Sequence, residues 1–182
     1  QLLLLHATFC LVNQIAAELF AHWNPSNLPF FHLHIALELL LLSWMFFAEG
    51  SVLHGRRVQM IGSVVWMIVA ICNAAWGEGL LNLPSLLLMI ESILLILFAG
   101  VYFFKVFKEM TVVTVEREFL FWVSMGILLF FAGTLLLSAF IEFLTDRKDV
   151  YFDVFLIRAF LIILTNICYA IGMLCKAHPQ KS

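Results

Sequence analysis

Six long apolar runs constrain the fold of this chain more than any other feature. They cover residues 2–23, 30–49, 57–76, 85–105, 119–145 and 150–175. A helix needs about 20 mostly apolar residues to cross the hydrocarbon core of a bilayer. Because lipid offers no partners to backbone N–H and C=O groups, such continuous runs form helices in a membrane. The sequence predicts an all-α, polytopic bundle of six transmembrane helices that forms a single domain over 1–182.

The composition agrees with this class and excludes several others. Of the 182 residues, 64% are hydrophobic and 12% are charged, which is about half the charged share of a soluble domain. Ten Lys and Arg against twelve Asp and Glu leave no basic excess, which argues against a nucleic-acid partner. The four cysteines show no CxxC spacing, which indicates packing residues rather than a zinc site or disulfides. The expected partner is the lipid bilayer.

Lysine and arginine are distributed unequally between the two sides of the predicted bundle, and this distribution sets its orientation. Loops on one side carry few cations, whereas loops on the other side, and the C-terminal tail, carry many. Cytoplasmic loops of membrane proteins are enriched in Lys and Arg, so the cation-rich side is expected in the cytoplasm together with the C-terminus. The residues on that side are Arg56, Arg57, Lys105, Lys108, Arg117, Lys176 and Lys181, and those on the other are Arg147 and Lys148.

Most polar residues of the six runs fall in the half that faces away from the cytoplasm. Ionisable groups inside a membrane are costly, so each is a candidate functional residue. Placed by a rise of about 1.5 Å per residue from the outer ends of their helices, these residues predict a ligand-binding or ion-pair cluster in a polar pocket open to the outside. The candidates are Glu18, His32, His34, Glu38, Asn73, Glu91 and Arg158.

Arg158 is the one cation of this set, and its expected partners are Glu91 and Glu38, because pairing offsets part of the cost of burying a charge. Carboxylates outnumber cations in the set. Some of them are therefore expected to be protonated, or to hold a cation. The alternative is an internal salt-bridge and hydrogen-bond network that fixes helix packing, and the sequence leaves both open.

A metal or a haem is a further alternative. His34 and Glu38 are four residues apart and share a helix face, as half of a metal site requires. A third ligand would come from Glu18 or Glu91. For a bis-histidine haem the partner of His34 would be His22, because His6 lies near the cytoplasmic start of its helix. No catalytic residues are predicted, since the chain contains no GxSxG, HExxH or P-loop motif.

Residues 31–39 read FHLHIALEL, residues 121–133 read FWVSMGILLFFAG, and residues 166–172 read NICYAIG. These segments resemble, in turn, the FHIYTxxEF, FWINSGLLIYFSG and NILLSIG of a family of polytopic integral membrane proteins, of about seven helices, from Bacteroidetes-type bacteria. Glu91-Ser92 and Tyr102-Phe103 match its LESLIxIxxSxxYF. Ser124 stands where that family has Asn, and Arg158 where it has His.

This resemblance implies one further helix upstream and a place in the bacterial inner membrane. It implies no established activity, although similar membrane modules precede bacterial histidine kinases. The leading functional prediction is a non-enzymatic sensor or accessory subunit with an outward-facing polar pocket, joined by other membrane subunits or by a second copy of itself. The alternatives are a haem- or metal-binding redox subunit and a small proton-coupled transporter.

Overall fold

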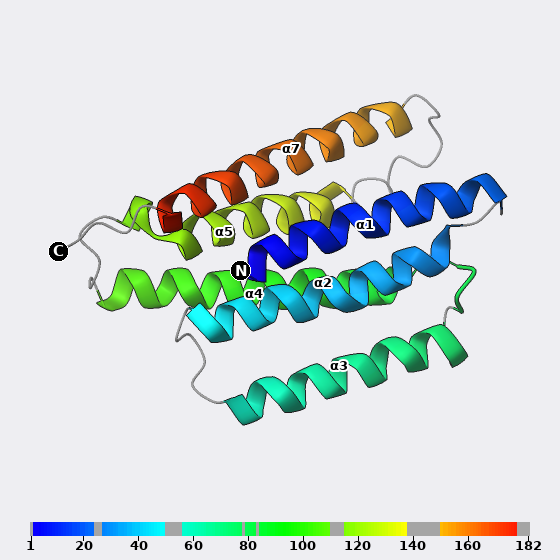
Figure 1. The fold of residues 1–182 in the computed structure, drawn as a ribbon, viewed down its shortest axis with the longest axis horizontal. Coiled ribbons are helices and arrows are strands. Elements are labelled where there is room, and N and C mark those ends of the chain that lie inside the picture. Colours follow the sequence, from blue (N-terminus) through cyan, green and yellow to red (C-terminus); the bar gives the residue numbers. More distant parts are fainter. Residues whose placement is uncertain are drawn as a thin grey trace. The chain divides into compact units, whose positions relative to one another are not determined.

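The computed structural model describes residues 2–23, 27–49, 56–77, 79–82, 84–109, 115–137 and 150–177, and every regular element within them is helical. Six helical stretches are long and apolar enough to cross a membrane, which confirms the predicted all-α, polytopic class (Figure 1). The long elements are α1 Leu2–Trp23, α2 Leu28–Glu49, α3 Arg56–Trp76, α4 Ser85–Glu109, α5 Phe119–Ile127 and α7 Val150–Ala177. A short turn, η1 Val115–Arg117, precedes α5, and a π-helical segment, η2 Leu128–Ala132, follows it.

The helix ends differ from the predicted ends by a few residues. The helix α2 begins at Leu28 rather than at residue 30, because Pro29 sits in a first turn whose N–H groups have no partner within the helix. The helix α4 continues to Glu109, beyond the predicted end at residue 105. Helical structure after η2 is described as far as residue 137, and the predicted end of that run, 138–145, lies outside the described residues.

The chain divides into two compact units, Gln1–Glu91 and Ser92–Ser182, so α4 belongs to both. In the first unit α2 is the central helix, with α1 on one side and α3 on another. Its buried side chains include Ile35, Leu42 and Phe46. The indole Nε1 of Trp66 on α3 donates a 3.0 Å hydrogen bond to the backbone oxygen of Ala36 on α2. Since a backbone carbonyl of α2 accepts it, this bond fixes where the two helices meet.

The helices α1 and α2 form an antiparallel hairpin whose two arms are offset along their axes. The Asn13 side chain donates to the backbone oxygen of Phe30 over 3.3 Å, and the rings of Phe20 and Phe30 lie 5.2 Å apart. Asn13 lies well before the end of α1, whereas Phe30 lies near the start of α2. The end of α1 therefore extends past the start of α2 by roughly eight residues, or about 12 Å (Figure 1).

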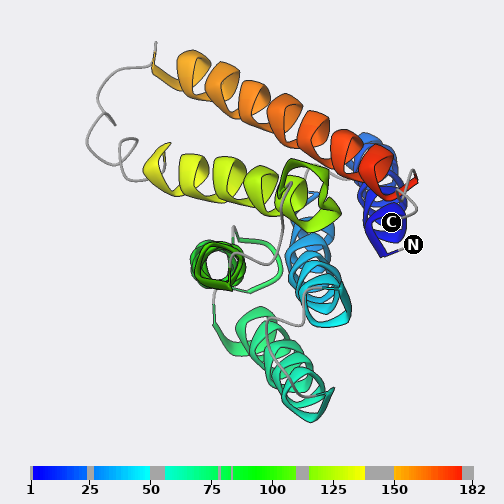
Figure 2. The same ribbon diagram turned by 90° about the vertical axis from the view of Figure 1, so that its left-hand side faces the viewer.

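In the second unit α5 and α7 run side by side (Figure 2). Small residues on α5 permit the close approach of α7. A Cβ atom added at Gly126 would lie 3.0 Å from the ring of Tyr169. The hydroxyl of Thr165 on α7 donates to the backbone oxygen of Gly126 over 3.2 Å, directly before the π-helical turn. At the other end of α5, the hydroxyl of Tyr102 on α4 donates to Glu118 over 3.0 Å.

Candidate functional site

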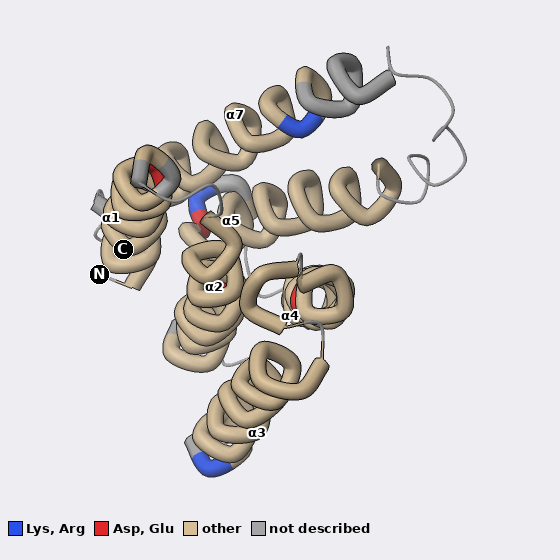
Figure 3. Tube along the Cα trace, turned by 90° about the vertical axis from the view of Figure 1, so that its right-hand side faces the viewer, with Lys and Arg blue, Asp and Glu red and all other residues tan. Residues whose placement is uncertain are grey.

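Charged residues are sparse along the helices (Figure 3), and one of them, Glu38, lies at the middle of α2 and contacts two histidines. Its Oε1 lies 3.5 Å from Nε2 of His6 on α1, and its Oε2 lies 3.2 Å from Nε2 of His34, one turn earlier on α2. The relative exposures of these side chains are 6% for His6, 13% for Glu38 and 26% for His34. We call these three residues the Glu38 cluster. It is a largely buried set of ionisable groups that joins two helices.

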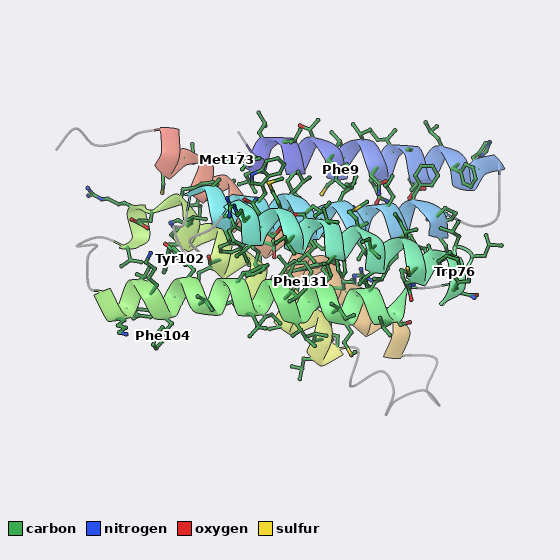
Figure 4. The ribbon with its side chains drawn as sticks, turned by 90° about the horizontal axis from the view of Figure 1, so that it is seen from below. Phe9, Trp76, Tyr102, Phe104, Phe131 and Met173 are labelled. Atoms are coloured by element: carbon green, nitrogen blue, oxygen red, sulfur yellow. The ribbon has the colours of Figure 1, made fainter. Side chains whose placement is uncertain are left out.

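The contacts of the Glu38 cluster define the directions of its hydrogen bonds. A carboxylate is an acceptor, so each imidazole donates an N–H from its Nε2 atom to one oxygen of Glu38. The ring of His34 is also stacked on Phe9 of α1, with centroids 5.9 Å apart and planes 14° from parallel. Phe9 points from α1 toward α2 (Figure 4). The stack holds the plane of the His34 ring, so the ring is oriented toward Glu38 by both helices.

Cys10 adds a thiol to this region, one helical turn after His6. Its Sγ lies 3.5 Å from Nε2 of His6, the same nitrogen that faces Glu38. In a nucleophile–histidine–acid triad the nucleophile and the acid contact opposite nitrogens of the ring. Here one nitrogen contacts both groups, so the arrangement does not activate Cys10 as a nucleophile.

Glu91 on α4 is another buried carboxyl group of the same unit. Its side chain is 1% exposed, and its Oε1 has no hydrogen-bond partner among the described residues. It lies within electrostatic reach of both Glu38 and Cys10. A buried carboxylate oxygen without a partner is costly in a medium of low dielectric constant. A proton on Glu91, or a cation beside it, would remove this cost.

His32 has a separate role near the start of α2. Its side chain is buried, and its Nε2 lies 3.0 Å from the backbone oxygen of Asn82, in the connection between α3 and α4. The contact joins the start of α2 to that connection. His32 therefore holds this connection in place and is not part of the Glu38 cluster.

The other two candidates of this unit face different surroundings. Glu18 is exposed on α1 and accepts a 3.3 Å hydrogen bond from the Gln14 side chain. Asn73 lies near the end of α3, where its backbone oxygen accepts N–H groups from Gly77 at 3.1 Å and Gly79 at 3.3 Å. Gly79 has a φ of 80°, in the left-handed region that glycine adopts without strain. The main-chain role of Asn73 is thus to help terminate α3.

Arg158 lies on α7, in the second unit, and its side chain is exposed. Both oxygens of Glu38 already face histidines of the first unit. The pairing of Arg158 with Glu91 and Glu38 that the sequence suggests stays a prediction.

The positions of the histidines and carboxylates bear on whether the site could ligate a metal ion or a haem. Among the described residues, no group of three or more His, Cys, Asp or Glu side chains has an arrangement that could hold a metal ion. For the haem, His34 faces Phe9 across the hairpin, whereas His22 is exposed at the far end of α1. Thirteen residues separate Phe9 from His22, about 20 Å along a helix. His22 and His34 are therefore too far apart to ligate one haem iron.

Two members of the site, His6 and Cys10, were not predicted from the sequence. Arms of equal depth would leave His6 near the cytoplasmic surface, at the start of its helix. The axial offset of α1 instead brings His6 level with Glu38. The sequence does contain one indication of this part of the site, because His6 and Cys10 share a helix face. The offset of the two helices, however, depends on packing.

The fold and the site define a class: a multi-pass integral membrane protein, in contact with the lipid bilayer, with an ionisable cluster inside its spans. No family model, curated protein or solved structure matches the chain. The function proposed below therefore rests on the geometry of the Glu38 cluster.

Proposed function

We propose that this protein is a sensor or accessory subunit of the bacterial inner membrane, and that the Glu38 cluster is its proton-responsive element. The proposal includes a polar pocket that reaches the cluster from the outer side, and a C-terminus in the cytoplasm. One observation carries it: a carboxylate in the middle of an apolar span faces histidines from two helices at 3.5 and 3.2 Å. Such a group binds or releases a proton with a direct effect on the contact between α1 and α2.

The charge balance of the cluster supports a response to protons. Imidazole is the side chain whose charge changes between about pH 5 and 8, and a protonated imidazole beside Glu38 forms a charge-assisted pair. The groups that contact Glu38 are His6 from α1 and His34 from α2, and Cys10 of α1 and Glu91 of α4 lie within electrostatic range of it. The other ionisable residues of α3 with described side chains, Arg57 and Cys72, are exposed. A proton gained at His6 strengthens the α1–α2 contact, and a proton gained at Glu38 weakens it.

The same geometry suggests how a signal leaves the cluster. The helix α2 is held by Trp66 of α3 and by the connection that His32 contacts. A change in the contact between His6 and Glu38 therefore acts on the position of α1, because α2 is held by these other contacts. A partner membrane subunit that rests on α1 would respond to this change.

Infrared difference spectroscopy on the purified chain in nanodiscs tests proton uptake directly. A step between a neutral and an acidic buffer changes the carbonyl band of a carboxyl group that gains a proton, and shifts the carboxylate bands of one whose partner gains a proton. We expect the carboxylate bands of Glu38 to shift when a neighbouring histidine gains a proton, and this change to be absent in Glu38→Gln. Glu18→Gln is the matched control, because Glu18 is exposed and contacts Gln14 rather than a histidine. Spectra of wild type and Glu38→Gln that are identical in this region would overturn the proposal.

Proton flux into liposomes separates the sensor from the transporter. A sensor binds protons without net transport, so the wild-type chain is expected to leave the decay of an imposed pH gradient at the rate of empty liposomes. Faster decay that is lost in Glu38→Gln would overturn the sensor role and favour a proton-coupled carrier.

A further inference from the structure

Asn166 places an amide on the exposed side of α7, at the middle of the apolar stretch Leu156–Cys175. One N–H of this amide donates to the backbone oxygen of Ile162, one turn earlier, over 2.9 Å. An amide has two N–H donors and an oxygen acceptor, so a donor and the oxygen remain for a group outside the helix. Exposed neighbours such as Ile163 and Ile167 are apolar. A polar group at this depth is costly in lipid unless another helix supplies a partner.

The residues around Asn166 line one side of α7. Ala159, Asn166 and Met173 are seven residues apart, and Ile162 and Ala170 lie between them on the same side of the helix. Positions seven residues apart face the same neighbour in left-handed helix pairs, the commonest packing of membrane helices. Ala159 and Ala170 are small, which allows close approach. A single Asn in the seam of such a helix pair fixes register and the number of strands.

We infer that two copies of this chain pair through α7, with Asn166 of each copy donating to the amide oxygen of the other. This goes beyond the proposed function, because the Glu38 cluster plays no part in it. Two copies inserted in the same direction and related by an axis along the membrane normal place any residue at the same depth as its counterpart. Asn166 then faces Asn166, and an amide is complementary to itself. A different partner protein would need a matching polar residue at this depth by coincidence.

Disulfide cross-linking in the native membrane tests this seam in the full chain. The natural cysteines Cys10, Cys72, Cys168 and Cys175 are first replaced by Ala. Met173→Cys is expected to form a cross-linked dimer on mild oxidation. The matched control is Ile68→Cys, on the exposed side of α3, which is expected to stay monomeric.

Substitutions at Asn166 separate the hydrogen bond from apolar contact. Asn166→Leu is expected to weaken dimerisation about tenfold, while Asn166→Gln keeps an amide and retains the cross-link. Leucine suits an exposed site in lipid, and a circular dichroism spectrum unchanged from wild type verifies that the variant is folded. The inference would be overturned if Met173→Cys gave no cross-linked dimer while Asn166 is present, or if Asn166→Leu left the cross-linking undiminished. Equal cross-linking at Ile68 would overturn it as well.

Discussion

Nε2 of His6 lies 3.5 Å from Oε1 of Glu38, so a histidine near the start of α1 contacts a carboxylate at the middle of α2. The contact exists because the two arms of the hairpin are offset by about 12 Å, as the bond from Asn13 to Phe30 shows independently. A polar contact between helices inside a membrane has no water to replace it. The stability of the hairpin and any response to protons are therefore linked at one residue.

Replacement of Glu38 by Leu removes the acceptor shared by His6 and His34. We expect the free energy of unfolding in mixed micelles, followed by tryptophan fluorescence, to fall by about 3 kcal/mol. Glu38→Gln retains an acceptor oxygen and is expected to lose about 1 kcal/mol. Glu18→Leu is the control and should leave stability within about 0.5 kcal/mol, since Glu18 is exposed. A loss in Glu38→Leu no larger than that of the control would contradict a structural link at Glu38.

Simultaneous replacement of His6, His34 and Glu38 by Leu separates stability from response. Apolar residues of similar volume often replace a buried ionic group without loss of stability. The triple variant is therefore expected to unfold within about 1 kcal/mol of wild type, and to lose the carboxylate signal in the infrared experiment. A triple variant that keeps this signal would show that the protonated group lies elsewhere.

Trp66→Phe tests the bond from α3 to the backbone of α2. Phenylalanine keeps most of the apolar contact but lacks the N–H that reaches Ala36. The expected loss is about 1–2 kcal/mol in the same unfolding measurement. Trp44 is exposed on α2, and Trp44→Phe should cost less than about 0.5 kcal/mol. Similar losses in the two variants would indicate that the bond contributes nothing measurable.

Gly126→Leu tests the close approach of α5 and α7. Even a Cβ atom at this position would lie 3.0 Å from the ring of Tyr169, so a leucine has to displace α7. We expect destabilisation of at least about 2 kcal/mol. Gly100→Leu on α4 is the matched control, because no atom lies within 4 Å of a Cβ built there. Leucine has the higher helix propensity, so stability in the control should be unchanged or slightly raised. Equal destabilisation of both variants would contradict the packing of α5 on α7.

The fold class was predictable because it depends on length and hydropathy. Apolar runs of bilayer length form helices independently of the helices they pack against, and six such helices are present. Observed helix ends differ from the predicted ends by a few residues, as at Leu28. The contact between His34 and Glu38 was also predictable, since four residues bring two side chains onto one face of a helix.

The contact between His6 and Glu38 was not predictable, because it depends on how far one helix slides along another. Sequence depth estimates assume that adjacent helices begin level with each other. Side-chain packing, here Phe9 against His34 and Phe20 against Phe30, sets the actual offset. Pairing of Arg158 with Glu91 stays a prediction for the same reason, since it depends on packing between helices far apart in the chain.

Solid-state NMR on the chain in lipid bilayers tests the contacts of the Glu38 cluster most directly. Labels on the ring nitrogens of histidine and on the side-chain carboxyl carbon of glutamate report contacts through their dipolar coupling. We predict strong coupling between glutamate carboxyl carbon and histidine Nε2 in the wild type. Half of the coupling should be lost in His6→Leu, and nearly all of it in Glu38→Gln. A wild-type spectrum without close histidine–glutamate contacts, or one that His6→Leu leaves unchanged, would contradict the Glu38 cluster.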